Sequence, residues 1–209
     1  VPKVGMLFLL FTVQDSLPHA AVWKSFLAKA PANAWRAWVH CVDHAACVQK
    51  NLTRELPGIE LVSTVYSERC TDLVSPQWKL VHEAMLDYPQ GVDGAADKFI
   101  LLSGACLPIK PFSVIHRHLT AMRNDESDFC LMNPKKEWQK TIVNGIVFYL
   151  VKHSQWAVLS RRHAQYFSDK WTGLDNSGKW SFYMPVKKFG GARFFLDRKD
   201  KHNWRCADE

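Results

Sequence analysis

The segment Lys98-Phe-Ile-Leu-Leu-Ser-Gly-Ala-Cys-Leu-Pro-Ile-Lys-Pro-Phe112 decides the fold of this chain. Its apolar run, Phe99 to Leu102, stops abruptly at Ser103-Gly104, and two prolines stiffen the backbone that follows. A short apolar run bounded by turn-forming residues predicts a strand buried on both faces. Ligands of open α/β sheets bind beyond the carboxyl ends of such strands, so we expect a substrate beside Ser103 and Gly104.

The composition indicates an ordinary globular protein. Of the 209 residues, 47% are hydrophobic and 22% are charged, which is typical of one domain with a substantial core. The formal charge of +7 and the isoelectric point of about 9.1 suit a nucleic acid, or a phosphorylated or nucleotide-bearing ligand. Because no dense Lys/Arg tract and no uniformly basic helix is apparent, we do not expect nucleic acid as the partner.

Outward from the central segment, apolar patterns predict alternating strands and helices. Strands are predicted over 6–13, 35–42, 61–66, 98–102, 128–132, 142–151, 155–159 and 190–196. Helices are predicted over 20–30, from Ser75 through Leu86, and over 112–122 and 161–171. This alternation predicts an α/β fold with a mostly parallel central sheet in a single domain.

The first apolar run, Met6 to Val13, could also be the core of a signal peptide. We favour a buried strand, because no small-residue cleavage site follows it. No run approaches the roughly 20 apolar residues that a membrane span requires, so we expect any membrane anchor to lie outside this segment. At the other end, Asp208 and Glu209 resemble the cap and first turn of a helix. We therefore expect 1–209 to be one domain that is incomplete at its C-terminus.

Six cysteines are scattered along the chain without a C-x-x-C pair, so the spacing of metal ligands is absent. Their even number is compatible with disulfides in an oxidising compartment, although the pairing cannot be deduced. Asn51-Leu-Thr53 matches the acceptor sequence for N-glycosylation. Together these features favour the secretory pathway.

Several well-known ligand-binding motifs are missing from the sequence. It has no P-loop, no G-x-G-x-x-G dinucleotide fingerprint and no G-x-S-x-G nucleophile elbow. The Asp-x-Asp pair that usually clamps the metal of a sugar nucleotide is also absent. Glu126-Ser-Asp128 comes closest to it, but is more simply interpreted as a solvated turn before a strand.

Four segments resemble a known family when they are taken in series. Lys98 to Phe112 resembles the central F-x-L-L-S-x-S-C-I-P-L segment of the core-2/I-branching glycosyltransferase family, especially its plant-type branch. The first strand with its Leu17-Pro18 turn is similar as well, and His153 to Arg161 resembles the family's G-S-Q-W-x-x-x-x-R segment. Arg205 to Glu209 is similar to the family's C-x-x-D-E-H site. The four segments follow the family's order and cover most of the chain.

The resemblance implies a GT-A-like fold and an inverting transfer of a sugar to a glycan hydroxyl. The donor would be a UDP-sugar, typically UDP-N-acetylglucosamine, and neither a metal nor another cofactor is expected. That expectation agrees with the missing Asp-x-Asp pair. The family consists of type II membrane proteins whose catalytic domain faces the Golgi lumen. A non-catalytic glycan-binding relative of the same fold is the alternative.

The resemblance also implies a set of site residues. Glu209 would be the general base that takes the proton of the acceptor hydroxyl, although a first-turn glutamate can also serve only the helix dipole. Asp208 would fix the turn beside it. Cations that neutralise the departing diphosphate are expected beyond Glu209. The donor-binding candidates, some of which could instead belong to a surface turn, are His40, Asp43, Ser103, Gly104 and Cys106.

The acceptor side is expected in the loop after the strand at 128–132. Lys135, Lys136, Trp138 and Lys140 form a basic and aromatic cluster there, and an aromatic face can stack on a sugar. A solvated loop explains the same cluster equally well. Trp156 is the remaining acceptor-binding candidate, and a position in the hydrophobic core is its alternative.

Overall fold

The computed structural model describes residues 5–67, 73–88, 96–131, 140–143, 146–149, 153–174, 179–184 and 192–197. Its strands are β1 (Leu7–Val13), β2 (Trp35–Cys41), β3 (Ile59–Val62), β4 (Lys98–Ser103), β5 (Asp128–Leu131), β6 (Lys140–Val143), β7 (Ile146–Tyr149), β8 (His153–Ser160), β9 (Trp171–Leu174), β10 (Lys179–Met184) and β11 (Ala192–Asp197). Its helices are α1 (Ala20–Leu27), α2 (His44–Gln49), α3 (Leu52–Glu55), α4 (Val74–Asp87), α5 (Phe112–Thr120) and α6 (Arg161–Lys170).

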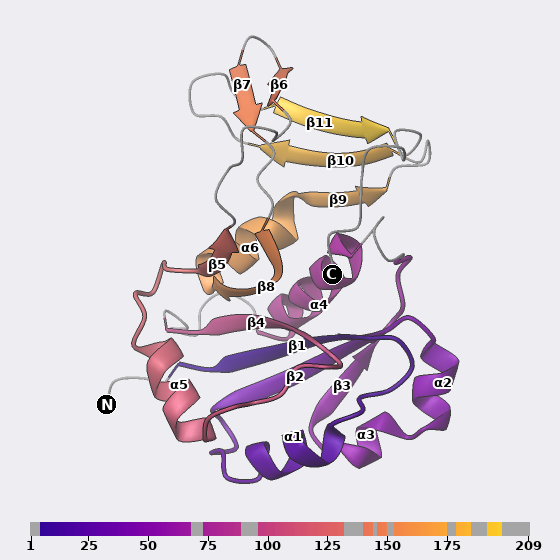
Figure 1. Ribbon diagram of the computed structural model, residues 1–209, viewed down its shortest axis with the longest axis vertical. Coiled ribbons are helices and arrows are strands. Elements are labelled where there is room, and N and C mark those ends of the chain that lie inside the picture. The colour runs from indigo at the N-terminus through magenta and orange to yellow at the C-terminus, as the bar shows by residue number, and fades with distance from the viewer. Residues whose placement is uncertain are drawn as a thin grey trace.

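A six-stranded sheet with the order β3-β2-β1-β4-β8-β5 forms the centre of the molecule (Figure 1). β1 pairs in parallel with β2 and β4, and β2 pairs in parallel with β3. β8 runs antiparallel to both of its neighbours, β4 and β5. All strands of this sheet except β8 therefore point the same way, which confirms the predicted α/β fold with a mostly parallel sheet.

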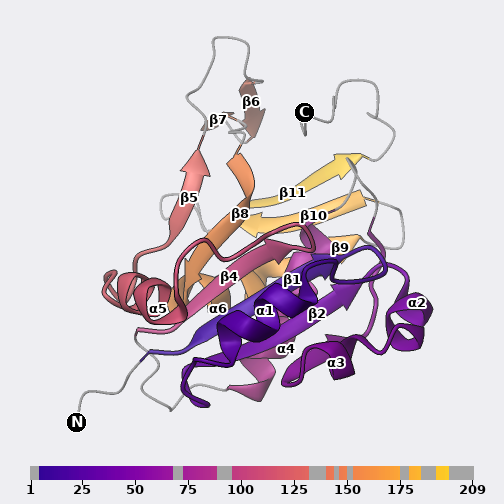
Figure 2. The ribbon, with the colours of Figure 1, turned by 60° about the horizontal axis from the view of Figure 1, so that its bottom comes forward.

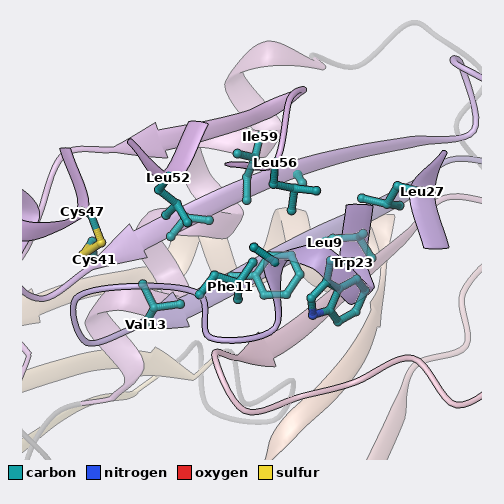
Figure 3. Close-up of a cluster of buried hydrophobic side chains, with 14 of the residues drawn as sticks. Leu9, Phe11, Val13, Trp23, Leu27, Cys41, Cys47, Leu52, Leu56 and Ile59 are labelled. Carbon is teal, nitrogen blue, oxygen red and sulfur yellow. A yellow bond between two sulfur atoms is a disulfide. The ribbon is translucent and has the colours of Figure 1, made fainter. Parts of the chain in front are cut away.

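Both faces of the sheet are covered, because the central strands are apolar on both sides. Leu9 and Phe11 of β1 face α1, α3 and α5, where Trp23 of α1 and Leu52 of α3 meet them (Figure 3). Phe8 and Leu10 point to the opposite face and belong to the cluster with α4 and α6. Figure 2 shows α1 in front of the sheet and α4 behind it.

Two predicted strands differ from those in the structure. The third strand is Ile59–Val62 rather than 61–66, because the chain after Val62 bonds to β2 through side chains. Thr64 Oγ1 donates to the carbonyl oxygen of Cys41 at 2.7 Å, and the Val65 N–H donates to His40. The predicted strand 142–151 is instead the antiparallel pair β6 and β7. The sequence between these strands, Asn144-Gly145, is the dipeptide that tight hairpins favour.

Other boundaries shift less, and some elements were not predicted. Helix α4 begins at Val74, one residue before the predicted start at Ser75. Trp171, predicted to end a helix, instead begins β9. The short helices α2 and α3 and the strands β9 and β10 were not predicted, although Trp180, Phe182 and Met184 alternate with Lys179, Ser181 and Tyr183 in β10. β9, β10 and β11 form a separate antiparallel sheet.

A buried ion pair joins the first residue of α6 to the chain just before β4. Arg161 Nη2 lies 2.6 Å from Asp97 Oδ2, and the two side chains are only 15% and 9% exposed. Asp97 Oδ1 also accepts the Met6 N–H at 2.8 Å, at the entrance to β1. The guanidinium lies 5.5 Å from the ring centres of both Phe8 and Phe99. This one pair therefore connects β1, β4 and α6.

A second buried cation fixes the other side of the same strand. The Lys98 side chain is fully buried, and its Nζ donates to the carbonyl oxygens of Arg123 and Glu126, both at 2.8 Å. Desolvation lowers the pKa of Lys98 below its ordinary value. These bonds tie the beginning of β4 to the connection between α5 and β5.

We predict that breaking the Asp97–Arg161 pair destabilises the whole sheet. Replacing Arg161 with Met leaves a buried carboxylate without its partner, which costs about 3–5 kcal/mol of the free energy of unfolding. Urea denaturation followed by circular dichroism measures this loss. The neighbouring Arg162→Met variant is the control, because Arg162 is exposed and should change stability by less than about 0.5 kcal/mol. Equal stability of the two variants would contradict the assigned role.

Candidate functional site

The strand order places a topological switch point between β1 and β4. From β1 the chain proceeds through β2 to β3 on one side, and α4 then returns it to β4 on the other side of β1. The loops that follow β1 and β4 lead to α1 and α5, which lie on the same face of the sheet, and the rings of Phe26 and Phe112 are 5.4 Å apart there. Open α/β sheets bind their ligands in the crevice that forms at such a point.

Polar side chains replace the apolar core along the carboxyl edge of these strands. Thr12 of β1 is in register with His40 of β2 and Ser103 of β4, so the three form one row on the face of the sheet that α4 covers. The row one pleat deeper is apolar and consists of Leu10, Trp38 and Leu101. Thr12 and Ser103 are both partly exposed, and this row marks the boundary between core and candidate site.

The turn after β4 is held tightly against the first strand. The Gly104 N–H donates to the Thr12 carbonyl oxygen at 3.2 Å, and the Ala105 N–H donates to Ser103 Oγ at 3.2 Å. A Cβ at Gly104 would lie 3.4 Å from Val13 Cγ1, so the two loops are in van der Waals contact. Backbone groups at the end of β4 are therefore fixed next to those at the end of β1.

Cys106 completes this turn and is not part of a disulfide. Its Sγ accepts the Ser103 N–H at 3.3 Å, and its carbonyl oxygen accepts a hydrogen bond from Trp23 Nε1 at 3.1 Å. The structure thus brings Ser103, Gly104 and Cys106, three of the predicted donor-binding residues, together at the switch point. Whether they contact a donor stays a prediction.

His40 is completely buried and acts on the loop after β3. Its Nε2 lies 3.0 Å from the Val65 nitrogen and 3.2 Å from the Val65 carbonyl oxygen, so a neutral ring can bond to Val65 through this atom in either tautomer. Burial lowers the pKa of His40 below its ordinary value, so the ring is neutral at physiological pH. Within the described part of the chain, neither Nδ1 of His40 nor the buried Oγ of Ser67 has a hydrogen-bond partner. His40 therefore positions the chain around Val65.

Asp43 likewise has a structural partner. Its Oδ1 accepts the Ala46 N–H at 2.9 Å and caps α2, so this carboxylate fixes the turn that leaves β2. Lys50, just after α2, reaches back to Asp15 in the loop after β1, with Nζ and Oδ2 2.6 Å apart. The hydrogen bond from Lys50 lowers the pKa of the Asp15 carboxyl. The loops that follow β1 and β2 are thereby linked at the surface.

Of the predicted acceptor-binding residues, the structure describes Trp156 and the backbone of Lys140, and neither belongs to this row. Trp156 of β8 is partly buried, and it alternates with Ala157, which packs in the cluster beneath α4 and α6. Trp156 is therefore on the opposite face of the sheet from Thr12 and Ser103. Lys140 is the first residue of β6, where it pairs with Tyr149. The predicted residues Lys135, Lys136, Trp138, Asp208 and Glu209 lie outside the described residues.

Two contributors to the edge were missed from the sequence. Thr12 is the one polar residue in the strand sequence Leu-Phe-Leu-Leu-Phe-Thr-Val, and this interruption could have identified it. Val65 acts through its backbone, which leaves no signal in the sequence. Across the described ranges, no cluster of three His, Cys, Asp or Glu side chains could hold a metal ion. No helix in those ranges is long and apolar enough to cross a membrane.

Comparisons with known proteins add little to this geometry. No protein-family model and no curated protein matches the sequence. Among solved structures, the chain is similar to 4-diphosphocytidyl-2C-methyl-D-erythritol synthase from Anaerococcus prevotii, with a TM-score of 0.41 and 8% sequence identity. The match covers 79% of this chain and 74% of that chain. A likeness of this size does not define a shared activity.

We predict that acid destabilises the fold through His40. A histidine whose pKa is lowered by folding contributes fully above its unfolded pKa of about 6.5, and that stability is lost as the pH falls through the folded pKa. The free energy of unfolding should therefore fall as the pH drops below about 6.5. In His40→Gln, whose side-chain oxygen can still accept the Val65 N–H, the fall should be smaller.

Urea denaturation over this pH range measures the effect. His118→Gln is the matched control, because His118 is exposed on α5 and should leave the pH dependence unchanged. An unchanged pH dependence in His40→Gln would refute the buried neutral ring.

Proposed function

We propose that this chain is the donor-binding part of an inverting glycosyltransferase of the core-2/I-branching type. It transfers a sugar, N-acetylglucosamine from UDP, to a glycan hydroxyl without a metal ion. One observation carries the proposal. The segment 98–112, which resembles the family's central segment, forms β4 and the turn at the switch point, where open α/β sheets bind nucleotides.

In this proposal the uridine diphosphate lies across the carboxyl ends of β1, β2 and β4. Ser103, Gly104 and Cys106 present a fixed turn to the donor. His40 and Asp43 act indirectly, through Val65 and through the first turn of α2. The formal charge of +7 favours a doubly charged diphosphate, and further cations are expected beyond Glu209.

The chemical step needs a carboxylate base opposite the leaving group. The acceptor hydroxyl oxygen forms a bond to the anomeric carbon while the bond to the diphosphate oxygen breaks, and UDP departs with the electron pair. Glu209 takes the hydroxyl proton, and Asp208 fixes the turn that carries it. The transition state resembles an oxocarbenium ion, as in glycosidases. Lys135, Lys136, Trp138, Lys140 and Trp156 are the proposed acceptor side.

The proposed location is the Golgi lumen, as part of a type II membrane protein whose anchor lies outside this segment. A disulfide between Cys41 and Cys47 supports an oxidising compartment.

Transfer activity tests this proposal directly. We expect the full-length protein to transfer N-acetylglucosamine from UDP-N-acetylglucosamine to a glycan acceptor in the presence of EDTA. Glu209→Gln should lower kcat by roughly 10²- to 10⁴-fold, because it removes the general base. Its affinity for UDP should stay the same, and the exposed Glu60→Gln should behave like the unmodified protein. Full activity of Glu209→Gln would refute the assigned base.

The alternative function gives a different result in the same assay. A non-catalytic relative would bind the glycan acceptor without consuming UDP-N-acetylglucosamine, and that outcome would overturn the proposed transferase.

A further inference from the structure

Asn51-Leu52-Thr53 is the one Asn-x-Ser/Thr sequence in the 209 residues that has no proline at its middle position. Such sequences are common by chance, so the sequence alone decides little. What matters is whether the fold presents the asparagine and whether the protein meets the enzyme that modifies it.

The fold uses the backbone of Asn51 and leaves its carboxamide exposed. Asn51 lies between α2 and α3 with a φ of 52°, a left-handed conformation that asparagine adopts more readily than most residues. Its N–H donates to the Val48 carbonyl oxygen at 3.0 Å, and its own carbonyl oxygen accepts the Arg54 N–H at 2.8 Å. The side chain makes no capping hydrogen bond to α3. A substituent on the amide nitrogen would therefore break none of these bonds.

The residues around Asn51 leave room for a large polar group. Leu52 points into the core and is 2% exposed, whereas Asn51 and Thr53 are both exposed. Near the end of α2, the apolar side chain of Val48 is 55% exposed. A glycan on Asn51 would extend into solvent next to Val48 without displacing any core side chain.

A disulfide four residues before the acceptor supplies an independent argument. Cys41 at the end of β2 is bonded to Cys47 in α2, and both residues are completely buried. Disulfides form and persist in the secretory pathway and are rare in the cytosol. The endoplasmic reticulum, where proteins acquire disulfides, is also the compartment in which N-glycans are attached. The same bond holds α2, and therefore the turn that carries Asn51, against the sheet.

We propose that Asn51 carries an N-linked glycan. The co-substrate is an oligosaccharide linked to a polyprenyl diphosphate. The Asn51 side-chain nitrogen forms a bond to the anomeric carbon of the first sugar and loses one proton. The bond from that carbon to the diphosphate oxygen breaks, and the lipid diphosphate leaves with the electron pair. This modification does not depend on the transferase activity proposed above.

The test is to express the full-length protein in eukaryotic cells and treat it with a peptide N-glycosidase. Mass spectrometry of the peptide that contains Asn51 reads out the site, because release in heavy-oxygen water converts a glycosylated asparagine into labelled aspartate. We expect this label at Asn51. Asn51→Asp, which tolerates the same backbone conformation, should lose the glycan.

Thr53→Ala is a second variant that leaves Asn51 in place, and it should also lose the glycan. Thr53→Ser is the matched control. It keeps the hydroxyl group that the Asn-x-Ser/Thr sequence requires, at the same exposed position, so it should keep the glycan. An unlabelled Asn51 in the full-length protein would overturn the proposal. An Asn51 that stays labelled in Thr53→Ala would overturn it too.

Discussion

The buried pair of Asp97 and Arg161 is the interaction on which the rest of the architecture depends. Asp97 precedes β4, and through its other carboxylate oxygen it also binds the backbone at the entrance to β1. Arg161 begins α6 directly after β8, the strand that opposes all the others. The pair thus joins the parallel part of the sheet to the reversed strand and its helix. A buried ion pair adds little compared with a well-packed apolar pair, but removal of either partner leaves an unpaired charge.

The Asp97–Arg161 pair also affects the position of the candidate site, because β4 extends from one end of the sheet to the other. Asp97 and Lys98 fix where β4 begins, and its register with β1 then sets where Ser103 and Gly104 emerge. On β2, the strand on the other side of β1, His40 holds the chain after β3 at the same edge. The candidate site is therefore an edge of backbone turns whose positions depend on groups buried deeper in the molecule.

The sequence predicted the sheet well where apolar runs are long and bounded by turns. The strands at 7–13 and 98–103 and the helices after them were confirmed within a few residues. The third strand exists, but its predicted bounds were wrong, because the chain after Val62 bonds to β2 through side chains and no longer through backbone pairing. The contact around Gly5 could not be predicted from the sequence either. A Cβ there would lie 2.5 Å from the Ala96 carbonyl oxygen, a close approach between two chain segments that no local pattern records.

The candidate site was predicted in part. Ser103, Gly104 and Cys106 could be found because a strand that ends at a glycine turn has a recognisable sequence. Thr12 could have been found as the polar interruption of an apolar strand, whereas Val65 could not, because it acts through its backbone. His40 beside a ligand stays a prediction; the structure shows that this residue is buried and contacts Val65, a partner that the identity of a residue at a strand end does not reveal.

The edge between β1 and β4 is the proposed binding site for a uridine diphosphate. The most direct measurement is a calorimetric titration of the full-length protein with UDP in the presence of EDTA. We expect saturable binding that Thr12→Phe abolishes, because a larger side chain would fill the polar row beside Ser103. Circular dichroism must show that this variant is folded. Absence of UDP binding would contradict the proposed site. So would a folded Thr12→Phe variant that binds UDP as tightly as the unmodified protein.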